Sequence, residues 1–324
     1  MTMTKTATFN AHFHPMPPSV LPYHRPYHRP YPPVVLLLGV LLLLGVFLLV
    51  PSSPSRAAGD INHATYDDII ERGTLTVTVY EDFPPFSSSV NGKLVGVDID
   101  IANAIAEKLG VKAVFRATAA GETVNDDLRN AIWKGHYLGG GVTDMMMHVP
   151  TETAFKRKND LVFIMGDYYQ EQLVLTRNII KTGEFPTLAI FRHEKIGVEL
   201  DSLPDFFLTG FGGGTLRENV VHYLTIPEAV AAMLNEEVSA VFAPRSQLES
   251  AFSAHTLSSE QKKRYETTHV VAPGLPKDRW SLGVAVSTHT RQLGYAIEDI
   301  LMQMNADGEI AAIFDHHQLT YTAP

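Results

Sequence analysis

The chain contains no cysteine, and this absence excludes several kinds of chemistry. Without thiols there is no disulfide, no thiolate metal ligand, no cysteine nucleophile and no lipid-modified N-terminal cysteine. The sequence also lacks the H-E-x-x-H pattern of zinc peptidases and the G-x-S-x-G pattern of serine hydrolases. Because no nucleophile–base pair or metal cluster is visible, we predict that the protein is not an enzyme and that it uses no cofactor or metal.

Basic residues are scarce outside the N-terminal region. The first 58 residues carry four basic residues and no acidic one, which leaves 22 basic and 35 acidic residues, a net charge of −13, for the rest of the chain. A body of this charge repels phosphate backbones, so nucleic acid is excluded as a partner. The composition is otherwise that of a globular protein, with 45% hydrophobic residues, and the length suffices for an export segment and two modest domains.

One long hydrophobic run lies near the N-terminus. Val34–Val50 has 17 residues and no polar side chain, which is at the lower limit for spanning a bilayer. Because basic residues precede the run and small residues follow it, we predict that residues 1–58 are a signal peptide with a long basic n-region, cleaved after Ala57 or Ala58. An uncleaved N-terminal anchor is the alternative. Both readings place residues 60–324 in the periplasm, with the membrane reached only through the N-terminal segment.

Short hydrophobic strands alternate with amphipathic helices after Arg72. Alternation and β-branched content predict strands at residues 75–79, 94–97, 111–115, 144–147, 195–198, 240–242 and 282–286. Helical periodicity predicts helices at residues 101–109, 127–133, 226–234 and 293–304. Thr225 and Glu228 form a capping-box pattern before the third of these helices. This β-α-β order predicts the α/β class, with mainly parallel sheets covered by helices.

Several sequence blocks carry a resemblance to a known family. They are GTLTV at 73–77, FPPF at 83–86, GKLVGVDIDIA at 92–102, WSLGVAV at 280–286 and MNADGEI at 304–310. In this order they resemble the family 3 extracellular solute-binding proteins, which are best known as amino-acid receptors of ABC transporters. The resemblance implies a two-lobed periplasmic binding protein fold (type II), in which two hinge crossovers join the lobes and a small ligand lies in the cleft between them. Lobe one would comprise residues 60–176 and 277–324, and lobe two residues 178–275.

Part of the chain is similar to a subgroup of such proteins. DDLRNAIWKGHYLGGG at 126–141, DMMMHVP at 144–150 and the Tyr168-Tyr169 pair resemble the binding-protein-like partners of PQQ-dependent methanol dehydrogenases. The chain would therefore deliver a small-molecule ligand to an ABC permease or serve as an accessory of a periplasmic PQQ dehydrogenase. An enzyme built on the same scaffold is a further alternative, because a fold alone does not determine function.

The resemblance also implies candidate ligand-binding residues. Phe83 follows the first strand, where the family has an aromatic ring that stacks on the ligand. The other candidates are Tyr80, Glu81 and Asp82 at the same strand end, His148 after the strand at 144–147, and the pair Tyr168 and Tyr169. For each residue the alternative is packing within the protein or a solvated loop.

Two features depart from ordinary amino-acid receptors, and three others have structural explanations. Arg157 lies near the arginine that binds a ligand carboxylate in such receptors but out of register, and Pro244-Arg245 stands where they have a carboxylate for the ligand ammonium. Asp98 and Asp100 precede a helix, which favours capping. The glycine runs at 139–141 and 210–214 are expected to be turns, and His316-His317 a surface feature.

Overall fold

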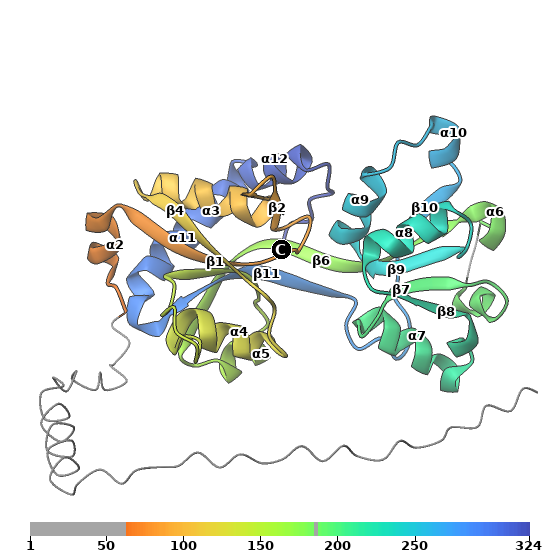
Figure 1. The fold of residues 1–324 in the computed structure, drawn as a ribbon, viewed down its shortest axis with the longest axis horizontal. Helices are drawn as coiled ribbons and strands as arrows, with labels where there is room; N and C mark the ends of the chain where they lie inside the picture. Colours follow the sequence, from red (N-terminus) through yellow and green to blue (C-terminus); the bar gives the residue numbers. More distant parts are fainter. Residues whose placement is uncertain (1–62, 185–186) are drawn as a thin grey trace, which may run out of the picture. The chain divides into compact units, whose positions relative to one another are not determined.

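The computed structural model describes residues 63–184 and 187–324 (Figure 1). The signal peptide expected at residues 1–58 lies outside the described residues, so its cleavage or anchoring stays a prediction. Within the described part of the chain, no helix has the length and apolar character needed to cross a membrane. The described body consists of two α/β lobes, and the long strand β6 (Val162–Asn178) runs through both of them (Figure 1).

Lobe one is built on a sheet in the strand order β4-β1-β5-β11-β6. β1 (Thr74–Tyr80), β4 (Lys112–Thr118) and β5 (Met145–Pro150) are parallel, and β11 (Arg279–Ser287) pairs antiparallel with β5 and β6. One face carries α3 (Val97–Lys108), α11 (Arg291–Ala306) and α12 (Glu309–His316), and the other carries α4 (Val124–Leu128) and α5 (Thr153–Lys158) (Figure 1). The smaller elements of this lobe are α2 (Tyr66–Arg72) and the hairpin of β2 (Ser88–Val90) and β3 (Lys93–Val95).

Lobe two continues the sheet in the order β6-β9-β7-β8, with β10 paired to β6. β7 (Ile196–Glu199), β8 (Val220–Tyr223) and β9 (Ala240–Pro244) are parallel, whereas β10 (Tyr265–His269) is antiparallel to β6. Helix α7 (Leu203–Gly214) covers one face, and α8 (Ile226–Leu234) and α9 (Arg245–Ser253) cover the other (Figure 1). The short helices α6 (Ile179–Thr182) and α10 (Ser259–Lys262) lie at the periphery.

The chain passes between the lobes within β6. Residues of β6 up to Gln172 pair with β11 of lobe one, and residues from Leu173 onward pair with β9 of lobe two. This change of partner falls a few residues before the predicted boundary at 176. The second passage is the segment between β10 and β11, which returns the chain to lobe one.

Most of the predicted strands and helices are present, with two local differences. The strand expected at 94–97 is only β3, because the backbone N–H of Val97 donates to the carbonyl of Pro85 at 3.1 Å and starts α3 instead. The helix expected at 127–133 is α4 followed by one π-helical turn, Arg129–Trp133. Thr225 caps α8 as predicted, but Glu228 accepts a hydrogen bond from the N–H of Leu224 rather than from that of Thr225.

The FPPF loop is held against α3 by the backbone. The N–H of Asp98 donates to the carbonyl of Phe86 at 3.0 Å, next to the bond between Val97 and Pro85. Gly96 makes this approach possible, since its φ is +137° and a Cβ atom there would overlap the Phe86 carbonyl. Gly96, the second glycine of the GKLVGVDIDIA block, therefore allows the loop after β1 to lie close to the first turn of α3.

Candidate functional site

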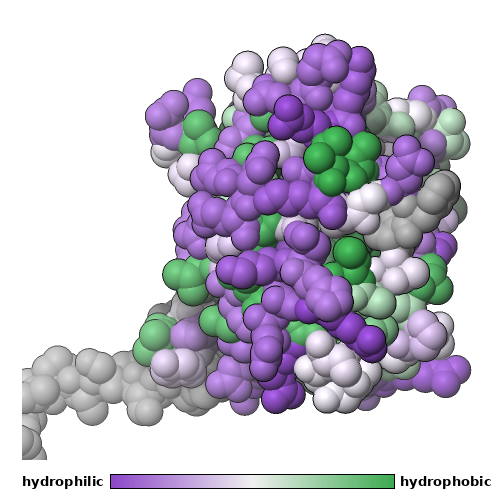
Figure 2. All heavy atoms as spheres, turned by 90° about the vertical axis from the view of Figure 1, so that its right-hand side faces the viewer, coloured by the Kyte–Doolittle hydropathy of each residue, from purple (hydrophilic) through white to green (hydrophobic). Residues whose placement is uncertain are grey.

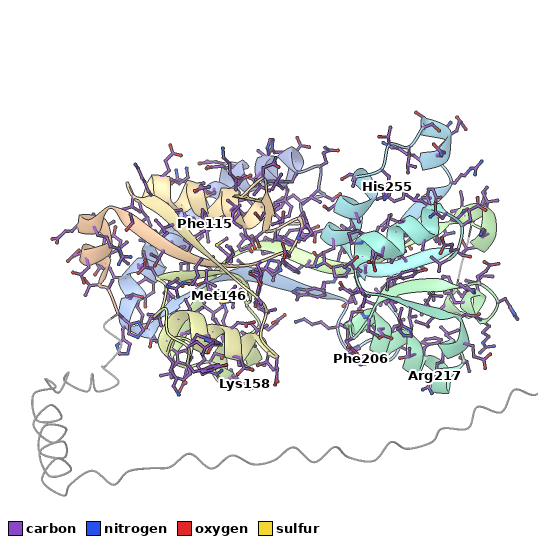
Figure 3. The ribbon with its side chains drawn as sticks, in the orientation of Figure 1. Phe115, Met146, Lys158, Phe206, Arg217 and His255 are labelled. Carbon is purple, nitrogen blue, oxygen red and sulfur yellow. The ribbon has the colours of Figure 1, made fainter. Side chains whose placement is uncertain are left out.

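The two lobes together line a cavity of about 400 Å³ in the cleft between them. Lobe one contributes Asp82, Phe83 and Pro84 from the loop after β1, and lobe two contributes Glu199 at the end of β7. Further lining residues come from the start of α8 and from α9 and its C-terminal end, among them Ile226, Pro227, Gln247, Ser250, Ala251 and His255. Figure 3 labels His255, which follows α9. A ligand held here would have contacts on both lobes, so hinge motion would close the cleft on it.

The cavity wall is mixed in character. Phe83, Pro84, Ile226 and Pro227 supply apolar surface. Asp82 and Glu199 supply carboxylates, and burial raises the pKa of Glu199 above its ordinary value. Among the described residues that line the cavity, none is arginine or lysine. The site therefore suits an apolar group with hydrogen-bond donors better than it suits an anion.

Phe83 both lines the cavity and packs within its own loop. Its ring stacks on that of Phe86 at a centroid distance of 5.7 Å, and it meets the edges of Tyr80 at 5.8 Å and His148 at 4.9 Å. The ring is half-buried, so one part remains available to a ligand. Phe83 therefore packs within its loop and also lines the cavity. Its stacking on a ligand stays a prediction.

The other candidate tyrosines lie inside lobe one. Tyr168 and Tyr169 are fully buried, and their hydroxyls donate to Asp98 at 2.7 Å and to Glu171 at 3.3 Å. Tyr80 is also buried and donates to Asp127 at 2.7 Å. Burial is the first cause that raises the pKa of each phenol. In this conformation the three rings form part of the core, so the packing alternative describes them better than ligand contact does.

Glu81 and Asp82 occupy different environments at the end of β1. Both side chains are exposed, but only Asp82 lines the cavity between the lobes. Asp82 has a φ of +49°, a left-handed conformation that turns the chain sharply after the strand. Of the three candidates at this strand end, Asp82 is therefore the one that the structure places against the cavity.

His148 is bound to a buried carboxylate. Its Nδ1 lies 3.2 Å from an oxygen of Asp98, whose other oxygen accepts the bond from Tyr168, and Asp98 is 1% exposed. The backbone of His148 has a φ of +62°, which is strained for a residue with a side chain. The expectation that Asp98 caps α3 was wrong, because its carboxylate points into this network and Gly96 occupies the cap position without a side-chain bond.

Asp100 differs from expectation, and His317 has a partner, whereas His316 is exposed as expected. Asp100 forms no cap but accepts a hydrogen bond from Nε2 of His317 at 2.7 Å. This contact joins the start of α3 to the end of α12. Within residues 63–184 and 187–324 there is no group of three or more histidine, aspartate and glutamate side chains that could hold a metal ion.

A buried acid marks the junction of the lobes. Glu171 in β6 accepts hydrogen bonds from the hydroxyl of Ser246 at the start of α9 and from the N–H of Gln172 at 2.9 Å. Burial raises the pKa of Glu171 above its ordinary value. Glu171 also pairs with Trp280 in β11, the strand that follows the second crossover. Its bond to Ser246 of lobe two therefore lies where both crossovers run side by side.

The two arginines that depart from the family pattern lie away from the cavity wall. Arg245 begins α9, and its guanidinium donates to the side-chain carbonyl of Gln172 at 2.8 and 2.7 Å when that amide is oriented to accept. Arg157 is exposed on α5 and does not line the cavity. Neither arginine is therefore placed to bind a carboxylate in the cleft.

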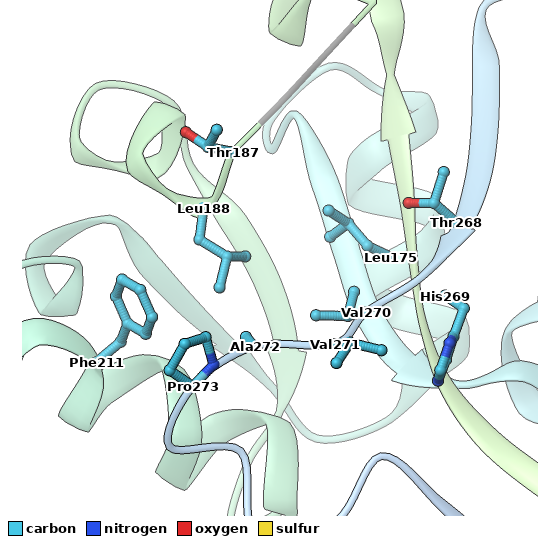
Figure 4. Close-up of a pocket in the computed structure, with 10 residues that line it drawn as sticks. All are labelled: Leu175, Thr187, Leu188, Phe211, Thr268, His269, Val270, Val271, Ala272 and Pro273. Atoms are coloured by element: carbon cyan, nitrogen blue, oxygen red, sulfur yellow. The ribbon is translucent and has the colours of Figure 1, made fainter.

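A second cavity of about 340 Å³ lies wholly within lobe two (Figure 4). Leu175, Leu188, Phe211 and Val270 face it from four separate segments (Figure 4). Since no residue of lobe one lines this cavity, hinge motion would not enclose a ligand there. The glycine run at 210–214 ends α7 near this cavity, with left-handed turns at Gly212 and Gly213 as expected.

The sequence did not point to the lobe-two side of the interlobe cavity. Glu199, Gln247 and His255 were not candidates, although Glu199 directly follows a predicted strand. The only available signal was the rule that ligands bind beyond the carboxyl ends of parallel strands, which applies to β7 as it does to β1. The α9 residues carry no motif and meet the cavity only through the packing of lobe two.

Comparison with known proteins agrees with this architecture. An ancestral cationic amino-acid solute-binding protein superimposes with a TM-score of 0.59 at 20% identity, covering 78% of this chain and 98% of the other. An amino-acid ABC transporter substrate-binding protein from Streptococcus pneumoniae, bound to L-arginine, gives 0.54 at 18% identity, covering 79% and 99%. A variant of the arginine-binding protein of T. maritima gives 0.51 at 19%, covering 78% and 97%. No match to a curated protein sequence was found.

The fold and its cleft are those of the two-lobed periplasmic binding protein fold. At these identities the structural matches establish the fold alone, but residues 75–320 match the bacterial extracellular solute-binding proteins, family 3. The chain therefore belongs to that family, as the resemblance of its sequence blocks implied.

Proposed function

We propose that this chain is an exported, non-catalytic binding protein that holds its ligand between the lobes, and that this ligand is not a standard amino acid. The observation that carries the proposal is the cavity of about 400 Å³ lined from both lobes. Membership of a family of extracellular binding proteins supports binding outside the cytoplasm. It also supports binding over catalysis, although one structural match is described as a precursor of cyclohexadienyl dehydratase.

The lost anchors argue against an amino acid. Pro244 replaces the carboxylate that would bind the ligand ammonium at its usual place, Arg245 is engaged by Gln172, and Arg157 lies outside the cavity. Removing one charged partner from a buried pair costs several kcal/mol, because the other charge remains desolvated and unpaired. An affinity in the nanomolar range would then become micromolar or weaker.

Two roles remain: delivery of a ligand to an ABC permease, and an accessory role with a PQQ-dependent methanol dehydrogenase. The apolar rim of lobe two favours contact with a protein: Leu200 and Leu224 adjoin the lining residues Glu199 and Thr225 and are 46% and 75% exposed. The opposite end of lobe two is mostly hydrophilic, with scattered hydrophobic side chains (Figure 2). We therefore carry the accessory role as a second candidate, with a segment of a methanol dehydrogenase against this rim.

Calorimetric titration of the exported domain tests the first proposal. We expect none of the twenty standard amino acids to bind with submicromolar affinity. A pull-down with purified PQQ-dependent methanol dehydrogenase from the same organism tests the second candidate. Tight binding of an amino acid, without a dehydrogenase complex, would return the protein to ordinary amino-acid uptake.

The Phe83→Ala variant tests the place of binding. If the ring is a contact surface, the substitution weakens binding of the compound or partner found above by about 1–3 kcal/mol and leaves the fold intact. Tyr295→Ala is the matched control, since Tyr295 is a half-exposed aromatic residue of α11 outside the cavity. Unchanged affinity together with a lower melting temperature in Phe83→Ala would mean that the ring serves only to pack the loop.

A further inference from the structure

The cavity between the lobes carries negative charge on both sides. Asp82 faces it from the loop after β1, and Glu199 faces it from the end of β7. Burial raises the pKa of Glu199 with no charged neighbour contributing to the shift. A half-buried carboxylate without a cation is unfavourable, so a positively charged ligand group would improve the electrostatics of this wall.

The helix ends at the cavity add no site for an anion. At the start of α8, the N–H of Glu228 already donates to the hydroxyl of Thr225 at 3.4 Å, and the Glu228 carboxylate accepts from the N–H of Leu224 at 3.1 Å. Glu228 thus occupies the place that an anion would take. The second helix end at the cavity is the C-terminal end of α9, which lines it through Ala254 and His255. The C-terminal end of a helix carries partial negative charge.

The cations at the junction of the lobes are engaged elsewhere. Arg245 donates to Gln172, as described above. Lys277 forms an ion pair with Glu152 and lies 5.9 Å from the centroid of the Trp280 ring. A carboxylate placed between the lobes would therefore meet Asp82 and Glu199, and no arginine or lysine among the described lining residues.

We propose that the ligand of this cavity is a small organic ammonium ion that carries no carboxylate. Its ammonium group lies between Asp82 and Glu199, and its apolar part lies on Phe83 and Ile226. The Phe83 ring adds attraction for a cation near its face, and the net charge of −13 after residue 58 raises the local concentration of cations. This inference rests on the proposed binding function of the same cavity and narrows its ligand to one chemical class.

Three compounds of matched size and different charge test the inference: 2-phenylethylamine, 2-phenylethanol and phenylacetate. At neutral pH and low ionic strength, where screening is weak, we expect calorimetry to show the amine binding at least about tenfold more tightly than the alcohol, and phenylacetate binding most weakly. Glu199→Gln and Asp82→Asn should each weaken amine binding about tenfold and leave alcohol binding unchanged. Glu218→Gln changes the charge equally at an exposed site of lobe two outside the cavity and should have no effect.

The outcomes separate this inference from the proposed function. Equal affinity for amine and alcohol, tighter binding of phenylacetate, or no binding of any of the three would overturn the cationic assignment. If phenylacetate bound and its affinity fell in Phe83→Ala, the cleft would still be the binding site and only the ligand class would be wrong. The proposed function itself would fail if an amino acid bound tightly, or if none of these compounds and no dehydrogenase bound to the protein.

Discussion

Glu171 shows what a single buried acid does at the junction of the lobes. Its carboxylate takes a hydrogen bond from Ser246, and the hydroxyl of Tyr169 donates to it at 3.3 Å. Desolvation is the largest effect and raises the pKa of Glu171, although the bonds from Ser246 and from the N–H of Gln172 favour the charged form. The folded protein therefore holds a proton on Glu171 at a pH where the unfolded chain has released it.

This shift predicts a pH dependence of stability. As the pH rises from about 4.5 through the folded pKa, the folded state binds more protons than the unfolded state, so the free energy of unfolding falls. Glu171→Gln should remove this contribution, which amounts to about 1.4 kcal/mol per pH unit where the states differ by one proton. Urea unfolding of both proteins across the pH range measures it, with exposed Glu218→Gln as control. Parallel pH profiles of wild type and Glu171→Gln would contradict the assignment.

At the scale of elements, the approach of the FPPF loop to α3 depends on one glycine. Gly96 and Gly92 both have positive φ angles, but only at Gly96 would a Cβ atom overlap another part of the chain, the carbonyl of Phe86. Around Gly92 nothing lies within 4 Å of such an atom. At Gly96, with φ +137° and ψ 173°, both the backbone conformation and the clash oppose a side chain, whereas at Gly92 only the backbone conformation does.

We expect Gly92→Ala to lower stability by about 1 kcal/mol, the usual cost of a left-handed conformation for an L residue. Gly96→Ala should cost several times more, because the Phe83–Phe86 loop must also move away from α3. Chemical unfolding compares the two variants, and amine titration reports the position of Phe83 in any Gly96→Ala protein that folds. Equal losses of stability would show that the backbone conformation alone matters.

The C-terminal segment forms another link between the lobes. After α12, the N–H of Thr320 donates to Glu249 of α9 at 2.7 Å, and the carbonyl of Thr322 accepts from the N–H of Gln170 in β6 at 2.9 Å. Leu319, the residue before these contacts, is buried in the core of lobe one. The chain thus touches lobe two again after returning to lobe one.

For the whole molecule, export decides where binding takes place. Cleavage of the predicted signal would leave a mature N-terminus between Ala58 and Asp60, just before the described body begins. Mass spectrometry of the mature protein should find this end in the soluble periplasmic fraction. An intact Met1 in the membrane fraction would instead support the N-terminal anchor.

Local patterns were sufficient for most elements of the fold. The β-branched run that forms β1, the consecutive prolines that force a loop at Phe83–Phe86, and Thr225 at the start of α8 act through their near neighbours. Such signals depend on the conformational preferences of a few consecutive residues. The order of these elements then led to the α/β class and, through the sequence blocks, to the two-lobed family.

Tertiary structure alone decided the chemistry of the site. Asp98 looked like a cap until Tyr168, 70 positions away, proved to be its partner. For Tyr168 and Tyr169 the sequence left ligand contact and core packing open, and their complete burial favours packing. Glu199 became a cavity residue because the ends of β1 and β7 face each other across the cleft. The sequence by itself determined the elements and their order, because those depend on short-range preferences. The partners of buried acids and the charge of the cavity depend on contacts between distant segments, and only the packed lobes bring those segments together.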